Sequence, residues 1–392
     1  MPFNSAEKLR VAPREPGMTK ETLTALNPPT ALADFLAASA SPAELVPYLG
    51  ALTPRQLDAP EVETGALLFG AAVHDLGWLR RIVVRGEDRF RWLSGMVTNG
   101  VESLSDKEGA YNLVLNAQGR IQGDCYAWRD GEALEVEVTA EQSDALTAHF
   151  DRFIIMDDVE LAPVVNQTAL GLAGPLAENI LEKLGLPALA ALASSNGIVD
   201  GIPVRLFRGY GMVVPHYALW ADAAQIPALW RAMLAAGATA VGAESLETLR
   251  ISEGIPAYGI DIQGRDLAQE TAQERALSFT KGCYLGQEIV ERIRSRGQVH
   301  RRLRAVEITP EGSAELPPTL PLAGAELRVA GSAPEAKPAG TLTSVTALQL
   351  PGARRIFAIA MIRAEAEIGN QPLMYSGGTA RILHNPPKFS AA

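Results

Sequence analysis

The chain has 392 residues, of which 47% are hydrophobic and 20% charged, with a formal net charge of −10 and two cysteines. This composition excludes a disordered or collagen-like chain, and the length suffices for two or three domains. The acidic balance disfavours broad adhesion to nucleic acid or anionic membranes, so any anion site must be a local basic patch. Two cysteines cannot form a disulfide framework, which favours a reducing compartment.

No run of the sequence approaches the roughly 18 consecutive apolar residues that a membrane-spanning helix needs. The first residues carry basic side chains such as Lys8 and Arg10, but no apolar block follows them, and Glu7 and Glu15 argue against a transit peptide. We therefore expect a cytoplasmic protein without membrane contact.

Prolines dominate the first part of the chain. Pro2, Pro13, Pro16, Pro28 and Pro29 predict a loosely ordered arm over residues 1–30. Helical spacing interrupted by further prolines predicts short helices over 31–57, so residues 1–57 form one N-terminal segment.

Two stretches of mixed strand and helix pattern follow, and each opens with a strand, a glycine and a helix. In the first, residues 58–165, we predict strands at 78–85, 110–116, 120–128 and 134–139, and a helix after Gly86. In the last of these strands, Glu135 and Glu137 alternate with apolar residues, which predicts one solvated face. In the second stretch, 166–302, we predict strands at 169–173 and 210–219, with helices after Gly174 and over 226–234.

The residue pattern of the sequence changes after Leu303. Short β-prone runs at 303–308, 326–329, 341–345, 356–362, 373–375 and 380–383 alternate with Pro- and Gly-rich stretches. This spacing, without a convincing helix, predicts a small all-β domain over 303–392, most simply a barrel.

The segment 278–292 carries the most distinctive chemistry. Gly282 and Gly286 bracket Cys283, and a helix can begin at Gln287. A helix N-terminus and the Lys281 ammonium would both favour a thiolate at Cys283. The alternative is a small buried cysteine without chemistry, which is the natural interpretation of Cys125 in its apolar strand. The five histidines are scattered and neither cysteine has a CxxC partner, so we expect no metal site.

A second charged feature lies between Arg292 and Arg304, where six arginines occur in thirteen residues without an acid. Such a cluster suits a folate glutamate tail, a phosphate or an RNA backbone. It equally suits a strip of arginines paired with acids at a domain interface.

The run Lys281-Gly282-Cys283-Tyr284-Leu285-Gly286-Gln287-Glu288, followed by Arg292, resembles the signature of the YgfZ-type folate-binding proteins. These are relatives of the glycine-cleavage T protein, an aminomethyltransferase. The segments Thr98-Asn99-Gly100-Val101, Gly174-Pro175 and Leu249-Arg250-Ile251-Ser252-Glu253-Gly254 also resemble elements of that fold. The resemblance covers most of residues 60–385.

The resemblance implies an α+β fold: two related α+β subdomains that form a folate-binding core, and a small C-terminal β-barrel. It implies tetrahydrofolate, or a folate derivative, as the ligand. Asp124 corresponds to the acid beside the reactive nitrogens, Tyr111 to an aromatic that flanks the pterin, and Leu79 to an apolar contact. Arg250 corresponds to a group that can pair with a carboxylate or carbonyl of the ligand.

From the residues alone each of these positions has a plainer alternative. Asp124 can equally be a polar strand residue near a turn. Tyr111 can be part of ordinary core packing, and Arg250 can form a salt bridge on a helix surface. A pterin nevertheless needs such walls and such a carboxylate, because it is a flat ring with a hydrogen-bonding edge.

The resemblance implies an accessory factor for iron–sulfur cluster assembly or repair, supporting enzymes such as those that thiolate transfer RNA. Cys283, Lys281 and Asp124 would then carry the chemistry, with iron–sulfur proteins as partners. The alternative is a folate-dependent aminomethyl or one-carbon transferase like the T protein, and a third possibility is an interaction protein that binds no folate. Tyr217-Ala218 stands where the T protein carries a folate-holding glutamate, which disfavours aminomethyl transfer.

Overall fold

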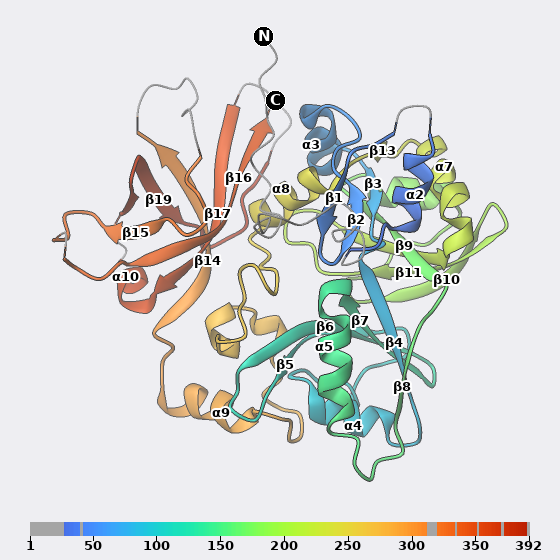
Figure 1. Ribbon diagram of the computed structural model, residues 1–392, viewed down its shortest axis with the longest axis horizontal. Helices are drawn as coiled ribbons and strands as arrows, with labels where there is room; N and C mark the ends of the chain where they lie inside the picture. Colours follow the sequence, from blue (N-terminus) through green and yellow to red (C-terminus); the bar gives the residue numbers. More distant parts are fainter. Residues whose placement is uncertain are drawn as a thin grey trace.

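The computed structural model describes residues 27–39, 42–311, 320–333, 335–350, 353–369 and 372–389. In this part of the chain two larger β-sheets with helices, and a two-stranded hairpin, lie beside a closed barrel (Figure 1). Most of the predicted N-terminal arm, residues 1–26, falls outside the described residues. No helix among the described residues is long and apolar enough to cross a membrane.

The described chain opens with helix α2 (Ala31–Ala37), whose first turn is capped by the Thr30 hydroxyl. Strands β1 (Leu45–Tyr48) and β2 (Ala51–Pro54) follow as an antiparallel hairpin, so the prediction of helices throughout 31–57 is wrong there. Leu49 and Gly50, both at positive φ, form a two-residue turn that fits the twist of a hairpin. Helix α3 (Pro60–Phe69) comes next.

The first sheet has five strands in the order β5-β6-β7-β4-β8 and confirms the strands predicted between 78 and 139. Its strands are β4 (Leu79–Arg85), β5 (Gly109–Leu115), β6 (Ile121–Asp130), β7 (Ala133–Thr139) and β8 (Glu160–Pro163). Helices α4 (Arg89–Met96) and α5 (Ala140–Asp151) bury their apolar side chains against it.

The second sheet has six strands in the order β10-β11-β12-β9-β3-β13. They are β3 (Ala72–Asp75), β9 (Gln167–Ala173), β10 (Ser194–Val199), β11 (Ile202–Arg208), β12 (His216–Asp222) and β13 (Thr239–Ala240). Strand β3 pairs with β9 although it precedes the first sheet in the chain, and the predicted domain bounds stay a prediction. The predicted strand at 210–219 begins later, at His216. Helices α6 (Ala177–Lys183) and α7 (Ile226–Ala235) pack on this sheet.

Both predicted strand–glycine–helix openings depend on glycine. Gly86 has φ +99°, and a Cβ there would lie 1.9 Å from the Asp158 carbonyl oxygen. Gly174 has φ +119°, and its Cβ would lie 2.5 Å from the Gly70 carbonyl oxygen. Only glycine combines this backbone conformation with such close packing.

The two sheets meet through a buried charged cluster, which corrects the prediction of a wet face on β7. Glu135 and Glu137 are buried, at 7% and 8% exposure, because the second sheet covers them. The guanidinium of Arg81 donates to Glu135 at 2.9 Å and to Glu137 at 2.8 Å. The same guanidinium lies over the rings of Phe207 and Trp220, at 3.7 and 4.4 Å from their centroids.

The C-terminal strands close into a six-stranded barrel, as predicted, in the order β14-β17-β16-β15-β18-β19. They are β14 (Arg301–Pro310), β15 (Glu326–Val329), β16 (Gly340–Leu350), β17 (Ala353–Arg363), β18 (Leu373–Tyr375) and β19 (Gly378–Ile382). A short helix, α10 (Ala364–Ile368), was not predicted.

A long connection joins the second sheet to the barrel and contains α8 (Ala243–Glu253), the turns η2 (Ala268–Thr271) and η3 (Glu274–Ala276), and α9 (Gln287–Arg296). One apolar cluster contains residues of the first sheet, of this connection and of the barrel. Its members include Tyr111 from β5, Leu249 from α8, Val290 from α9 and Phe357 from β17. This shared core fixes the connection between the first sheet and the barrel.

Candidate functional site

The centre of the candidate site is Asp124 on β6, a half-buried carboxylate held by two partners. One carboxylate oxygen accepts from the Tyr111 hydroxyl at 2.8 Å, and the other accepts from the Gln142 side-chain amide at 2.9 Å. Gln142 also accepts from the Asp124 backbone N–H at 3.0 Å. Burial raises the pKa of Asp124, while the hydrogen bonds from Gln142 and Tyr111 oppose that shift.

Aromatic rings surround this carboxylate. Tyr111 and Tyr126 lie side by side, with ring centroids 5.2 Å apart, and Tyr126 is 6.5 Å from Tyr210 on the segment before β12. Burial, followed by the charge of Asp124, raises the pKa of the Tyr111 hydroxyl well above its ordinary value, so this hydroxyl stays protonated and donates. A flat heteroaromatic ligand would find stacking walls and one carboxylate here.

A positive group joins the same wall. Arg275, in η3, lies over the Tyr210 ring at 4.6 Å and over the Tyr111 ring at 5.5 Å from the centroids. Its charge also helps to stabilise the Asp124 carboxylate. No sequence pattern marked Arg275, because the turn that contains it shows neither periodicity nor a motif.

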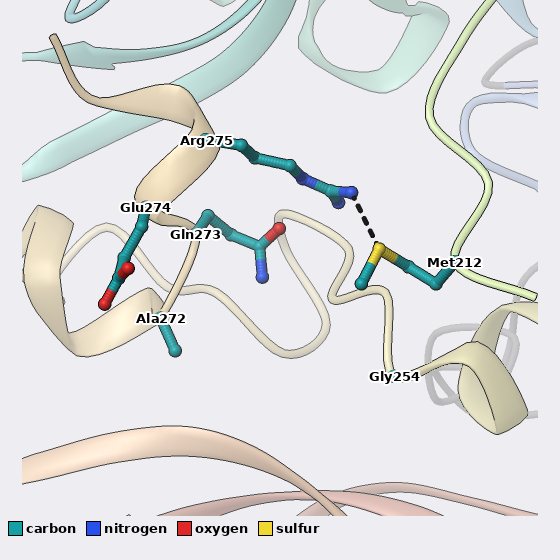
Figure 2. Close-up of a pocket in the computed structure, with 6 residues that line it drawn as sticks. All are labelled: Met212, Gly254, Ala272, Gln273, Glu274 and Arg275. Atoms are coloured by element: carbon teal, nitrogen blue, oxygen red, sulfur yellow. Dashed lines mark hydrogen bonds between the residues drawn. The ribbon is translucent and has the colours of Figure 1, made fainter. Parts of the chain in front are cut away.

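Arg275 lines a cavity of about 200 Å³, shown in Figure 2. The guanidinium extends from η3 toward Met212, whose sulfur lies 3.3 Å from one terminal nitrogen. The Gln273 amide points into the same space, whereas the Glu274 carboxylate points away from the end of the arginine. The remaining lining residues are Gly254 and Ala272.

The segment carrying Tyr210 and Met212 is fixed by a buried carboxylate, Glu253 at the end of α8. Glu253 accepts from the backbone N–H groups of Val213 at 2.9 Å and Val214 at 3.1 Å, and its other oxygen lies 3.1 Å from His216 Nε2. Although burial opposes both shifts, the pair interaction raises the pKa of His216 and lowers that of Glu253. The glutamate therefore positions one wall of the cavity.

The segment with the Lys281–Glu288 run is tied to the end of α4. The Lys281 ammonium donates to the carbonyl oxygens of Ser94, Val97 and Asn99, the last at 2.8 Å. Burial lowers the pKa of Lys281 to about 7, whereas the three carbonyls favour its ammonium form. The Thr98 hydroxyl donates to the Ala276 carbonyl at 2.6 Å. These contacts assign Lys281 an anchoring role in this structure.

The structure distinguishes the two cysteines. Cys283 is exposed ahead of α9, as expected for a reactive thiol, and Cys125 is buried in β6. Burial strongly raises the pKa of Cys125, which keeps it a thiol. Thiolate chemistry at Cys283 stays a prediction.

The other residues of the run mainly shape the turn before α9. Gln287 accepts from the Tyr284 backbone N–H at 3.0 Å, and the Tyr284 ring is buried. Glu288 and Arg292 are exposed on the helix. Gly286 has φ +81°, and a Cβ there would lie 2.5 Å from the Asn116 carbonyl oxygen of the β5–β6 turn. At Gly282 a Cβ would meet open space, so the structure gives no steric reason for that glycine.

The two other predicted folate contacts, Leu79 and Arg250, lie on separate elements, β4 and α8. Leu79 is half-buried at the start of β4. Arg250 donates to Glu247 at 2.6 Å, to Asp261 at 2.7 Å and to the hydroxyl of Ser344 in the barrel at 3.2 Å. These contacts make Arg250 a junction between α8 and the barrel, and ligand contact by Arg250 or Leu79 stays a prediction.

Five of the six arginines between Arg292 and Arg304 fall into two groups. Arg301 pairs with Asp266 and Glu270, and Arg304 pairs with Glu367. Three others, Arg292, Arg294 and Arg296, are exposed on α9. The interface alternative therefore describes the first group, and anion or RNA contact by the second stays a prediction. Among the described residues no group of three or more His, Cys, Asp or Glu side chains could hold a metal ion.

Comparison with known proteins identifies the family of this chain. A family profile described as the GCVT N-terminal domain matches residues 39–281, more than half of the chain. The chain belongs to this family. Proteins similar to it include aminomethyltransferases.

The chain is 28% identical over 281 residues to the aminomethyltransferase of Rubrobacter xylanophilus, covering 69% of this chain and 74% of that protein. It is 27% identical over 245 residues to a chloroplastic protein of Arabidopsis thaliana that is provisionally named a transferase. That match covers 61% of this chain and only 57% of the Arabidopsis protein's length.

A crystal structure of the glycine cleavage system aminomethyltransferase T from Bartonella henselae superposes with a TM-score of 0.76 at 17% identity. It covers 91% of this chain and 95% of that one. At this identity the likeness establishes the fold alone, including the C-terminal barrel.

Proposed function

We propose that the chain binds tetrahydrofolate in the space bounded by Asp124, the tyrosines and Arg275, and that it acts as a folate-dependent one-carbon transferase. The single observation that carries the proposal is the Asp124 carboxylate, half-buried among Tyr111, Tyr126 and Gln142. The similarity to proteins named aminomethyltransferase supports the transferase class.

The residues present fit such a ligand. A carboxylate has about four lone-pair sites, and Tyr111 and Gln142 use two of those of Asp124, so acceptor capacity is left for a ligand N–H. The Tyr111 and Tyr126 rings would flank the pterin. Bound tetrahydrofolate would supply the nitrogens that accept a one-carbon unit. The raised pKa of Asp124 would suit it to hold or take up a proton at that position.

Replacing Asp124 by Asn tests the proposal. The amide keeps the shape: its oxygen can accept from Gln142, and its NH2 group can donate to the Tyr111 hydroxyl, which then accepts instead of donating. It lacks the charge and one acceptor oxygen, so we expect tetrahydrofolate to bind about 10- to 100-fold more weakly in calorimetry. Turnover of an N-methyl or aminomethyl substrate with tetrahydrofolate should fall with it.

The exposed Asp144→Asn on α5 is the matched control and should leave affinity unchanged. Equal affinities of the wild type and Asp124→Asn would contradict the proposed role of this carboxylate. Absence of any tetrahydrofolate binding to the wild type would reject folate altogether.

The second candidate is a YgfZ-type accessory factor in iron–sulfur cluster assembly or repair, serving enzymes such as those that thiolate transfer RNA. The exposed Cys283 in its glycine-flanked turn favours this candidate. Tetrahydrofolate binding without any turnover would favour the accessory role over the transferase. A cytoplasmic location, expected from the sequence, stays a prediction for both.

A further inference from the structure

Arg275 differs from Arg81 and Arg250 in what its side chain contacts. Arg81 pairs with Glu135 and Glu137, and Arg250 pairs with Glu247 and Asp261. Among the described residues, by contrast, no carboxylate lies within 4.0 Å of Arg275, and its buried Nε has no hydrogen-bond partner. Its described contacts are two aromatic faces and the sulfur of Met212.

These contacts leave a guanidinium poorly satisfied. A thioether is a weak acceptor, and an unpaired buried N–H group is unfavourable. The carboxylate of Asp124, on which the charge of Arg275 acts, already accepts from Tyr111 and Gln142. The free N–H groups of Arg275 therefore have their best acceptor in the cavity that the side chain lines (Figure 2).

We propose that Arg275 binds a carboxylate group of a ligand in this cavity. The inference rests on the proposed function, because the carboxylate would belong either to the folate or to the substrate that reacts with it. The planar guanidinium matches a carboxylate through two parallel N–H···O hydrogen bonds. Such a ligand would displace the Met212 sulfur from the terminal nitrogen, and the Gln273 amide could donate beside it.

Size and charge limit what this carboxylate can belong to. About 200 Å³ is smaller than the roughly 300–1,000 Å³ of a pocket for a whole drug-sized ligand. The cavity thus takes one end of a ligand or a small acid. Arg275 is the single basic residue among its six lining residues, and Glu274 lies at its rim, so a monocarboxylate fits and a polyphosphate does not.

Two sources supply a carboxylate of this kind: the glutamate end of tetrahydrofolate, and a small N-methylated amino acid that would react with it. Calorimetry on the full chain separates them with matched pairs of ligands. Tetrahydropteroate lacks the glutamate of tetrahydrofolate, and sarcosinamide lacks the carboxylate of sarcosine. Each pair is titrated into the wild type and into Arg275→Gln.

If the glutamate end binds here, Arg275→Gln weakens tetrahydrofolate about 10- to 100-fold and weakens tetrahydropteroate much less, since only tetrahydrofolate loses the carboxylate contact. If a small acid binds here, the variant weakens sarcosine to the same degree, and the wild type prefers sarcosine over sarcosinamide. Arg275→Lys should recover part of the loss, because it keeps the charge without the fork. The exposed Arg231→Gln on α7 controls for loss of charge, and thermal unfolding controls for folding.

Unchanged affinities of Arg275→Gln for both tetrahydrofolate and sarcosine overturn the inference. If the wild type binds neither tetrahydrofolate nor tetrahydropteroate, the proposed function fails instead, and the sarcosine pair alone then decides the inference.

Discussion

His216 shows how a single residue links the protonation state to the wall of the cavity. Its partner Glu253 holds the backbone of Val213 and Val214, next to Met212. Burial disfavours the imidazolium, but Glu253 outweighs burial and raises the pKa of His216. The charged pair therefore stabilises the loop that carries Met212.

The pH range of this stabilisation follows from the two shifts. A raised histidine pKa contributes stability that is complete below the ordinary value of 6.5 and is lost as pH rises through the folded-state pKa. The lowered pKa of Glu253 contributes above 4.5 and is lost as pH falls through its folded-state pKa. The pair is thus strongest between these ordinary values.

His216→Gln should consequently lower the free energy of unfolding by about 1 kcal/mol more near pH 5.5 than near pH 8.5. At pH 5.5 the substitution removes the charge-assisted hydrogen bond between a protonated His216 and Glu253, whereas at pH 8.5 that charge is already lost. Urea unfolding at both pH values measures this. Burial lowers the pKa of the neighbouring His74 to about 4, but His74 is present in both proteins and largely cancels in the difference. The exposed His300→Gln controls for the loss of an imidazole as such, and a pH-independent effect of His216→Gln would contradict the assigned pair.

Part of the candidate site could be predicted from the sequence, residue by residue. Asp124 and Tyr111 were predicted from their family resemblance, and the structure brings them into hydrogen-bond contact. Arg275 and Gln142 were not predicted, because an arginine in a turn and a glutamine on a helix carry no pattern that separates them from surface residues. Their partners are supplied by the tertiary fold alone.

At the scale of elements, the docking of α9 on the β5–β6 turn positions the segment that carries Cys283. Figure 1 shows α9 beside the end of that hairpin. Gly119 in the turn would place a Cβ 2.7 Å from Ile289 of α9, and Gly286 packs on Asn116. Two glycines, one on each side, permit this close approach.

Gly286→Ala should therefore destabilise the protein by about 2–4 kcal/mol, since alanine is strained at positive φ and its Cβ would collide with the Asn116 carbonyl. Gly282→Ala, in open space four residues earlier, is the matched control and should stay within about 0.5 kcal/mol of the wild type. Chemical unfolding compares the two, and similar losses in both variants would contradict the docking.

Most elements could be predicted because their periodicity reflects local burial, as in β4, α7 and the barrel strands. The hairpin at 45–54 could not, because its prolines and short apolar runs read equally as broken helices. The dry face of β7 escaped prediction for a different reason. Alternation shows that Glu135 and Glu137 share a face, but only the packing of the second sheet buries that face around Arg81.

At the scale of the whole molecule, the Arg81 cluster joins the two sheets. Arg205 from the second sheet donates to Glu135 at 2.8 Å, and Trp220 donates to Glu137 at 3.1 Å. The acids of one sheet thus receive hydrogen bonds from both sheets, and their burial depends on all of these donors.

Arg81→Leu should lower the free energy of unfolding by about 3–5 kcal/mol, because Glu137 in particular would lose its buried cationic partner. Arg91→Leu, which removes an exposed arginine paired with Asp88 and Asp157, should change it by about 0–1 kcal/mol. Thermal and urea unfolding distinguish the two. Comparable losses would show that the joint between the sheets depends on apolar packing instead.

The barrel is fastened at one point by Asp261, a carboxylate exposed by only 1%. It accepts from Ser344 at 2.7 Å, Thr343 at 2.5 Å, Arg250 at 2.7 Å and the Ala257 backbone at 3.0 Å. The two hydroxyls lie where the β16 ladder shifts register. A barrel transplanted from a relative onto this chain would therefore need hydroxyls at the positions of Thr343 and Ser344, in a strand with the same register shift. Without them, the buried Asp261 carboxylate would lack two of its hydrogen-bond donors.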